Sequence, residues 1–169
     1  MLLAALLALQ IAAADAWKDP SSDRGLVGGY NDRNPFAKVI RGELPVHKIY
    51  EDAHVLAFVS PRQTSPGHCL VISKSSRARN ITEVEPAELS RVMAVVQKVA
   101  RAERDALGAE GVWVRQNNGS ASGQTVFHMH FHVVPRWAGR EPLPGEIPLA
   151  PDAELAAVQA KLVSVLRRR

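Results

Sequence analysis

Residues 127–136 read FHMHFHVVPR and place three of the chain's six histidines at every second position. Two residues is the repeat of a β-strand, so a strand here would present His128, His130 and His132 on one face. The residues between them are apolar and would lie on the opposite face. The segment is therefore expected to be a strand with one titratable face and one face suited to a hydrophobic core.

Upstream of this strand, the sequence predicts a short helix followed by three strands. Asn34 suits the N-cap of that helix, Pro35 suits its first turn, and Gly42 suits the position just past its end. Strands are expected at 48–51, 55–59 and 68–73, where short apolar runs alternate with loops rich in Pro, Ser and Gly.

Two further helices and one more strand complete the expected order of elements. Helical spacing of apolar residues begins at Thr82, which with Glu85 forms a capping-box pattern, and stops at Gly108. A strand is expected at 112–116, and a last helix from about Asp152. The short connections favour an antiparallel β-sheet with helices packed on one side, which is an α+β fold.

The two ends of the chain differ in composition from the centre. An apolar run from Leu2 to Ala14 leads into Ala-Asp-Ala, which predicts a signal peptide over residues 1–16 and an exported protein. The alternative is a cytoplasmic protein, and the run is too short for a stable membrane span. Residues 17–33 are expected to be a linker, 34–136 the domain, and 137–169 a tail and helix packed on it.

Composition narrows the classes of partner. The 169 residues carry a formal net charge of +4, and no basic stripe with interleaved aromatic residues is present, so no nucleic-acid partner is expected. The single cysteine, Cys69, excludes a disulfide within the chain. Cys69 lies in the apolar run CLVI, which favours a small buried side chain over a nucleophile.

Three kinds of chemistry could explain the histidine row. Alternating histidines can bind zinc, they can satisfy hydrogen bonds in a core, or one can attack phosphorus while its neighbours hold phosphate oxygens. The preceding loop, NNGSASGQT at 117–125, favours the third, because glycine backbone and hydroxyl or amide side chains can donate to an anion.

The segment GQTVFHMHFHVVPR resembles the signature of the histidine triad (HIT) superfamily of nucleotide hydrolases and transferases. NPFAKVIRGELPVHKIYED and SPGHCLVISK also resemble the opening half of these domains, in the expected order. The resemblance implies a HIT-like fold, a homodimer, a purine nucleotide substrate, and a mechanism that needs neither metal nor cofactor.

The resemblance also implies roles for the histidines. His130 would be the nucleophile that takes up the nucleotidyl group as a phosphoramidate. His132 and His68 would contact the α-phosphate and stabilise its charge. His128 would order the site and help to keep His130 in the tautomer whose free nitrogen faces phosphorus.

Further residues match substrate-binding positions of the family. Gln124 and Thr125 match positions near the scissile bridge, and Asn117 matches an asparagine that binds phosphate or leaving group. Ser60 stands where many members carry an acidic residue that binds the ribose, which weakens that expected contact. His132 stands where the transferase branch typically has Gln, and this favours hydrolysis.

The expected function is hydrolysis at the α-phosphate of a purine nucleotide derivative, through a covalent nucleotidyl-histidine. The substrate is either a nucleoside phosphoramidate or a dinucleoside polyphosphate. The alternatives are a nucleotide-binding protein that kept the histidines but lost turnover, and a zinc-dependent enzyme that uses the histidine row.

Overall fold

A computed structural model of the chain describes residues 14–141 and 147–168. Five strands form one antiparallel sheet in the order β1-β2-β3-β5-β4. The strands are β1 (Lys48–Glu51), β2 (Val55–Val59), β3 (Cys69–Ser73), β4 (Gly111–Arg115) and β5 (His130–Arg136). The helices are α2 (Pro35–Ile40), α3 (Pro86–Leu107) and α4 (Asp152–Leu166), with a 3-10 turn, η1 (Ser120–Ser122). The expected α+β fold is confirmed.

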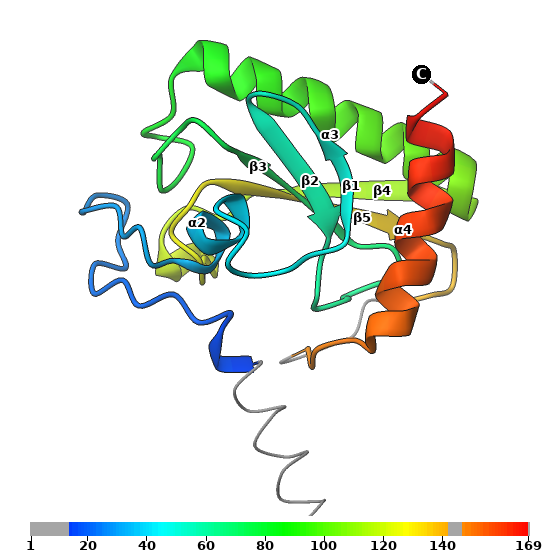
Figure 1. Cartoon of the computed structure of the whole chain (residues 1–169), viewed down its shortest axis with the longest axis horizontal. Coiled ribbons are helices and arrows are strands. Elements are labelled where there is room, and N and C mark those ends of the chain that lie inside the picture. Colours follow the sequence, from blue (N-terminus) through cyan, green and yellow to red (C-terminus); the bar gives the residue numbers. More distant parts are fainter. Residues whose placement is uncertain (1–13, 142–146, 169) are drawn as a thin grey trace, which may run out of the picture.

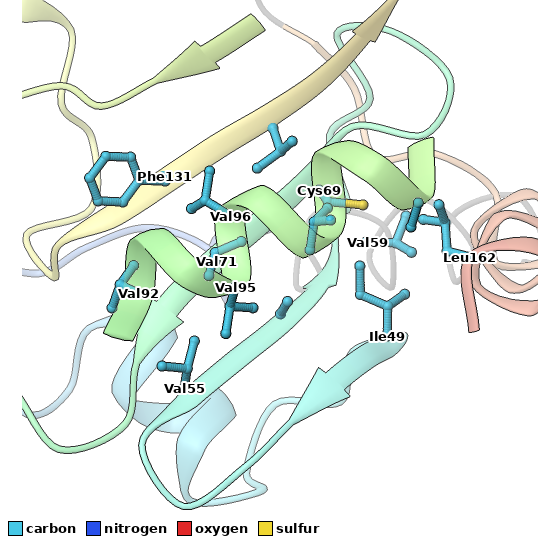
Figure 2. Packing of buried hydrophobic residues seen from close by; sticks show 14 of the residues in the cluster. Ile49, Val55, Val59, Cys69, Val71, Val92, Val95, Val96, Phe131 and Leu162 are labelled. Carbon is cyan, nitrogen blue, oxygen red and sulfur yellow. The ribbon is translucent and has the colours of Figure 1, made fainter. Parts of the chain in front are cut away.

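The two faces of the sheet support two separate hydrophobic clusters. On one face, alternate residues of β2, β3 and β5 pack against α3 and α4, among them Val71, Phe131 and Val96 (Figure 2). On the other face, Phe58 and Leu70 pack with residues of the short helix α2. The two long helices therefore share one side, as predicted, while α2 covers the opposite side (Figure 1).

The long helix α3 begins four residues later than the sequence predicts. Its N-cap is Glu85, whose backbone is extended and whose side chain makes no capping hydrogen bond. Pro86 explains this start, because proline suits the first helical turn and forces the preceding residue out of the helical region. The predicted capping box is thus wrong, and Thr82 instead donates to Asn80 Oδ1. The predicted stop is confirmed, with Gly108 at φ 65°.

The segment 17–33, expected to be a linker, is irregular but packs against the domain. Phe127 N donates to Asp19 Oδ2 at 2.6 Å, and the amide of Asn80 donates to Leu26 O at 2.7 Å. Trp17 packs edge-on against Phe36, with ring centroids 6.4 Å apart. The sequence prediction missed this packing because glycine, serine and aspartate suit both a free linker and an irregular segment bound to a surface.

The remaining expectations concern the two ends and the cysteine. Most of the predicted signal segment, residues 1–13, lies outside the described residues. Among residues 14–141 and 147–168, no helix combines the length and apolar character needed to cross a bilayer. The tail helix α4 packs on the domain, with Leu155 and Leu162 buried in the core. Cys69 is fully buried, and burial raises the pKa of its thiol.

Candidate active site

The three histidines do not all belong to the strand. Strand β5 begins at His130, which pairs with Ile72, and it includes His132, which pairs with Leu70. His128 precedes the strand in a bend. Phe36 of α2 nevertheless contacts both His128 and His130 edge-on, with centroid distances of 6.1 and 4.9 Å. The row thus lies on the side of the sheet that α2 covers, and the expected strand holds only two of its three members.

Hydrogen bonding selects the tautomer of His130. Its Nδ1 lies 2.7 Å from the carbonyl oxygen of His128. A carbonyl oxygen can only accept, so Nδ1 must carry the hydrogen. In the neutral ring, Nε2 is then the nitrogen with the free lone pair. Burial lowers the pKa of His130, which favours this neutral, nucleophilic form.

His132 and His68 form a second pair of rings beside the first. His68 Nδ1 lies 2.9 Å from Arg62 O, so this nitrogen donates, and its Nε2 accepts from His132 Nδ1 at 2.9 Å. Burial lowers the pKa of His68 to about 4 and that of His132 to about 2. At neutral pH both rings are therefore uncharged, and Nε2 of His132 has a lone pair that can take up a proton.

A cavity of about 480 Å³ opens in front of these rings. Small-molecule sites usually occupy about 300–1,000 Å³, so a nucleotide-sized ligand fits this volume. Apolar side chains and polar groups both line it, and the lining includes Trp17, Phe36, Leu70, Val126, His68, His130, His132, Ser60, Asn117 and Thr125. The structure therefore brings six of the eight predicted site residues to one cavity.

The loop that supplies the polar wall depends on two glycines. Gly119 and Gly123 have φ values of 76° and 87°, in the left-handed region that favours glycine. The side chain of Asn117 donates to Gly123 O at 3.3 Å, which ties the two ends of the loop together. Asn117, Gly123 and Thr125 all line the cavity. The loop thus places donors beside the histidines, where the sequence predicted a phosphate.

Gln124 and His128 do not line the cavity with the other predicted residues. The amide of Gln124 donates to Arg79 O and Val126 O, and its oxygen accepts from Gly119 N. The sequence matched Gln124 to a position near the scissile bridge, and in the structure its donors and its acceptor hold the loop. His128 is buried, and its backbone carbonyl accepts the hydrogen bond from Nδ1 of His130.

Ser60 lines the cavity at the expected place, yet its hydroxyl also serves the local turn. Ser60 Oγ donates to Arg62 O at 2.9 Å and accepts from Arg62 N at 3.3 Å. Its donor is therefore occupied, and any bond to a ribose hydroxyl would use the remaining acceptor capacity.

Two residues of the site region escaped the sequence prediction. Tyr30 approaches His128 Nδ1 at 2.6 Å, and Trp17 forms part of the cavity wall. The only available signal was the presence of large aromatic residues in a segment otherwise rich in Gly, Ser and Asp. Among residues 14–141 and 147–168, no cluster of three or more His, Cys, Asp or Glu side chains is arranged to hold a metal ion.

This geometry agrees with the comparisons to known proteins. Residues 41–139 match the HIT domain family, and the chain belongs to that family. "Protein hit" of Bacillus subtilis is 42% identical over 102 residues, which are 60% of this chain and 70% of that protein. An adenosine 5'-monophosphoramidase of Schizosaccharomyces pombe is 38% identical over 101 residues, which cover 60% and 72% of the two chains. The crystal structure of a Hit-like protein of Bartonella henselae aligns with a TM-score of 0.77 at 40% identity, over 82% of this chain and 99% of that one.

Proposed function

We propose that this protein hydrolyses a nucleoside phosphoramidate or a dinucleoside polyphosphate at the α-phosphate of a purine nucleotide. The observation that carries the proposal is the tautomer of His130, whose Nδ1 donates to His128 O and whose Nε2 is left to attack. The name of the Schizosaccharomyces pombe relative, a monophosphoramidase, favours the phosphoramidate as the substrate to test first.

The first step forms a bond between His130 Nε2 and phosphorus and breaks the bond from phosphorus to the leaving nitrogen or oxygen. The anionic α-phosphate raises the proton affinity of His132, because an opposite charge stabilises an imidazolium. His132 Nε2, once protonated, contacts the phosphate and gives this proton to the departing nitrogen or oxygen, while His68 holds the other side of the ring. Water then attacks phosphorus, and the bond from phosphorus to His130 Nε2 breaks. The proton that the water loses passes to His132 Nε2, the nucleotide leaves, and His130 regains its free Nε2.

Mass spectrometry of protein quenched without acid during turnover of adenosine 5'-phosphoramidate tests this scheme. A nucleotidyl mass on the peptide that carries His130 is expected. His130→Ala should lose more than about 10³-fold in kcat, since the nucleophile is removed. The control is His54→Ala, an exposed histidine, which should keep the wild-type rate. Near-normal turnover by folded His130→Ala would contradict the proposal, and AMP binding without turnover by the wild type would favour a binding protein.

We also propose that the chain forms a homodimer through the β4 edge of the sheet. Strand β4 is an edge strand, and Val114 is 45% exposed on it. Trp113 lies under the guanidinium groups of Arg115 and Arg136, at 4.2 and 4.5 Å. An exposed edge with apolar side chains is suited to pairing with a second copy. Light scattering should give twice the chain mass, and Val114→Lys should reduce it to the single mass.

A further inference from the structure

Tyr30 contacts the histidine motif from a distant part of the sequence. Its hydroxyl lies 2.6 Å from Nδ1 of His128, 98 residues away, and the two rings are 5.7 Å apart at 58°. Tyr30 lies upstream of residues 41–139, the region that matches the HIT domain family. It belongs instead to the segment 17–33 that packs along the domain surface.

The direction of this hydrogen bond follows from the other side of the His128 ring. Nε2 of His128 lies 2.9 Å from Ser73 O, and a carbonyl oxygen cannot donate. Nε2 therefore carries the hydrogen, and in the neutral ring Nδ1 is an acceptor. Burial lowers the pKa of His128 to about 4, which agrees with a neutral ring. The Tyr30 hydroxyl is thus the donor, and both ring nitrogens are bonded.

The backbone carbonyl of His128 links the ordered ring of His128 to the proposed nucleophile, His130. Its carbonyl accepts the hydrogen of His130 Nδ1, which keeps the Nε2 lone pair free. Residue 128 precedes β5, so strand pairing does not hold it. Its neighbours are fixed by Phe127 N donating to Asp19 and by Met129 N donating to Ala78 O. The segment 17–33 therefore supplies two anchors at this point, one through Asp19 and one through Tyr30.

We propose that Tyr30 is a positioning residue for the reaction. By donating to Nδ1 of His128, it fixes the ring and, with it, the carbonyl that holds the proton on Nδ1 of His130. Loss of the hydroxyl leaves a buried ring nitrogen without its donor and lets the residue that carries this carbonyl move. This inference rests on the proposed function, in which His130 Nε2 attacks phosphorus.

Tyr30→Phe tests the role, because it removes the hydroxyl and keeps the ring. The expected result is a fall in kcat of about tenfold or more, equal to about 1.4 kcal/mol, with KM within about twofold of wild type. The matched control is Tyr50→Phe, at the other tyrosine of the chain. Tyr50 donates to Asp52 Oδ2 on the exposed edge β1, and its loss should leave kcat unchanged.

Nitrogen NMR of the histidine rings gives a second readout that needs no turnover. In the wild type, His128 should carry its hydrogen on Nε2 and show a hydrogen-bonded Nδ1, while His130 should carry its hydrogen on Nδ1. In Tyr30→Phe, the His128 Nδ1 signal should move toward that of an imidazole nitrogen with no donor. The control Tyr50→Phe should reproduce the wild-type spectrum.

Two results would overturn the proposal. One is a wild-type spectrum with the hydrogen on Nδ1 of His128, which is measurable even where the variant fails to fold. The other is a folded Tyr30→Phe with wild-type kcat and unchanged histidine signals. A wild-type protein that shows the expected tautomers but no turnover would refute the proposed function and leave the structural role of Tyr30 established.

Discussion

Glu103 on α3 predicts an unusual dependence of stability on pH. The side chain is fully buried, and neither carboxylate oxygen has a hydrogen-bond partner among the described residues. Burial raises its pKa from 4.5 to about 9. The folded protein therefore holds a proton on Glu103 across neutral pH, whereas the unfolded chain releases it above about pH 4.5.

The sign and size of the effect follow from this difference in bound protons. The stability that comes from the raised pKa is fully present below pH 4.5, and it is lost as the pH rises toward 9. The slope is about 1.4 kcal/mol per pH unit, so the contribution of Glu103 to the free energy of unfolding should fall by about 3 kcal/mol between pH 5.5 and 8. Glu103→Gln cannot ionise and removes this dependence.

Urea unfolding of both proteins at several pH values between 5.5 and 8 measures the effect. The stability of Glu103→Gln relative to wild type should grow by about 3 kcal/mol over that range, because other titrating groups cancel in the difference. Glu154→Gln, at an exposed glutamate of α4, controls for the chemical change itself. A difference between wild type and Glu103→Gln that stays constant with pH would refute the reasoning.

Further predictions concern the histidines, the ribose, metal and the leader. Burial lowers the pKa of His68, His128 and His132, so the stability that these neutral rings contribute is fully present above about pH 6.5 and is lost as the pH falls toward 4. In Glu103→Gln, where residue 103 cannot titrate, the urea midpoint should therefore fall between pH 7 and pH 5. Ser60→Asp should raise the preference for ribonucleotides over deoxyribonucleotides by about tenfold, measured by calorimetry, since a carboxylate accepts a stronger bond; an unchanged preference would place the ribose elsewhere. EDTA should leave turnover unchanged, and a loss restored by zinc would favour a metal enzyme. Protein produced in a secreting bacterial host should lack residues 1–16 by intact mass, whereas a full-length soluble product would contradict the predicted signal peptide.

The sequence predicted most of the helices and strands because local patterns of apolar and turn residues favour the same elements as the folded sheet. Strands at 48–51 and 55–59 match β1 and β2 exactly in extent, since their short apolar runs end at turn residues. The start of α3 differed because the steric effect of Pro86 on Glu85 outweighs the capping preference of Thr82. Helix α2 was predicted correctly, but its position on the opposite face depends on packing with Phe58 and Leu70.

The site was predicted less completely than the fold. Spacing alone placed His130 and His132 on one face, because the strand repeat is local. The roles of Tyr30 and Gln124 depend on contacts between residues far apart in the chain. Tyr30 contacts His128, which is 98 residues away in the sequence, and Gln124 donates to the carbonyl oxygen of Arg79, 45 residues away. No local pattern encodes such pairs, so the sequence placed Tyr30 in a linker and assigned Gln124 to the substrate.

The packing of Asp19 and Tyr30 against the histidine motif has a consequence for how the proposed activity could be transferred to another chain. His130, the proposed nucleophile, lies inside residues 41–139, but two anchors of the backbone beside it lie upstream of that region. Recombination that moved only the matched segment into another chain would carry the reactive group without its alignment. If Tyr30 positions the site as proposed, the unit that must be moved together is therefore longer than the matched domain.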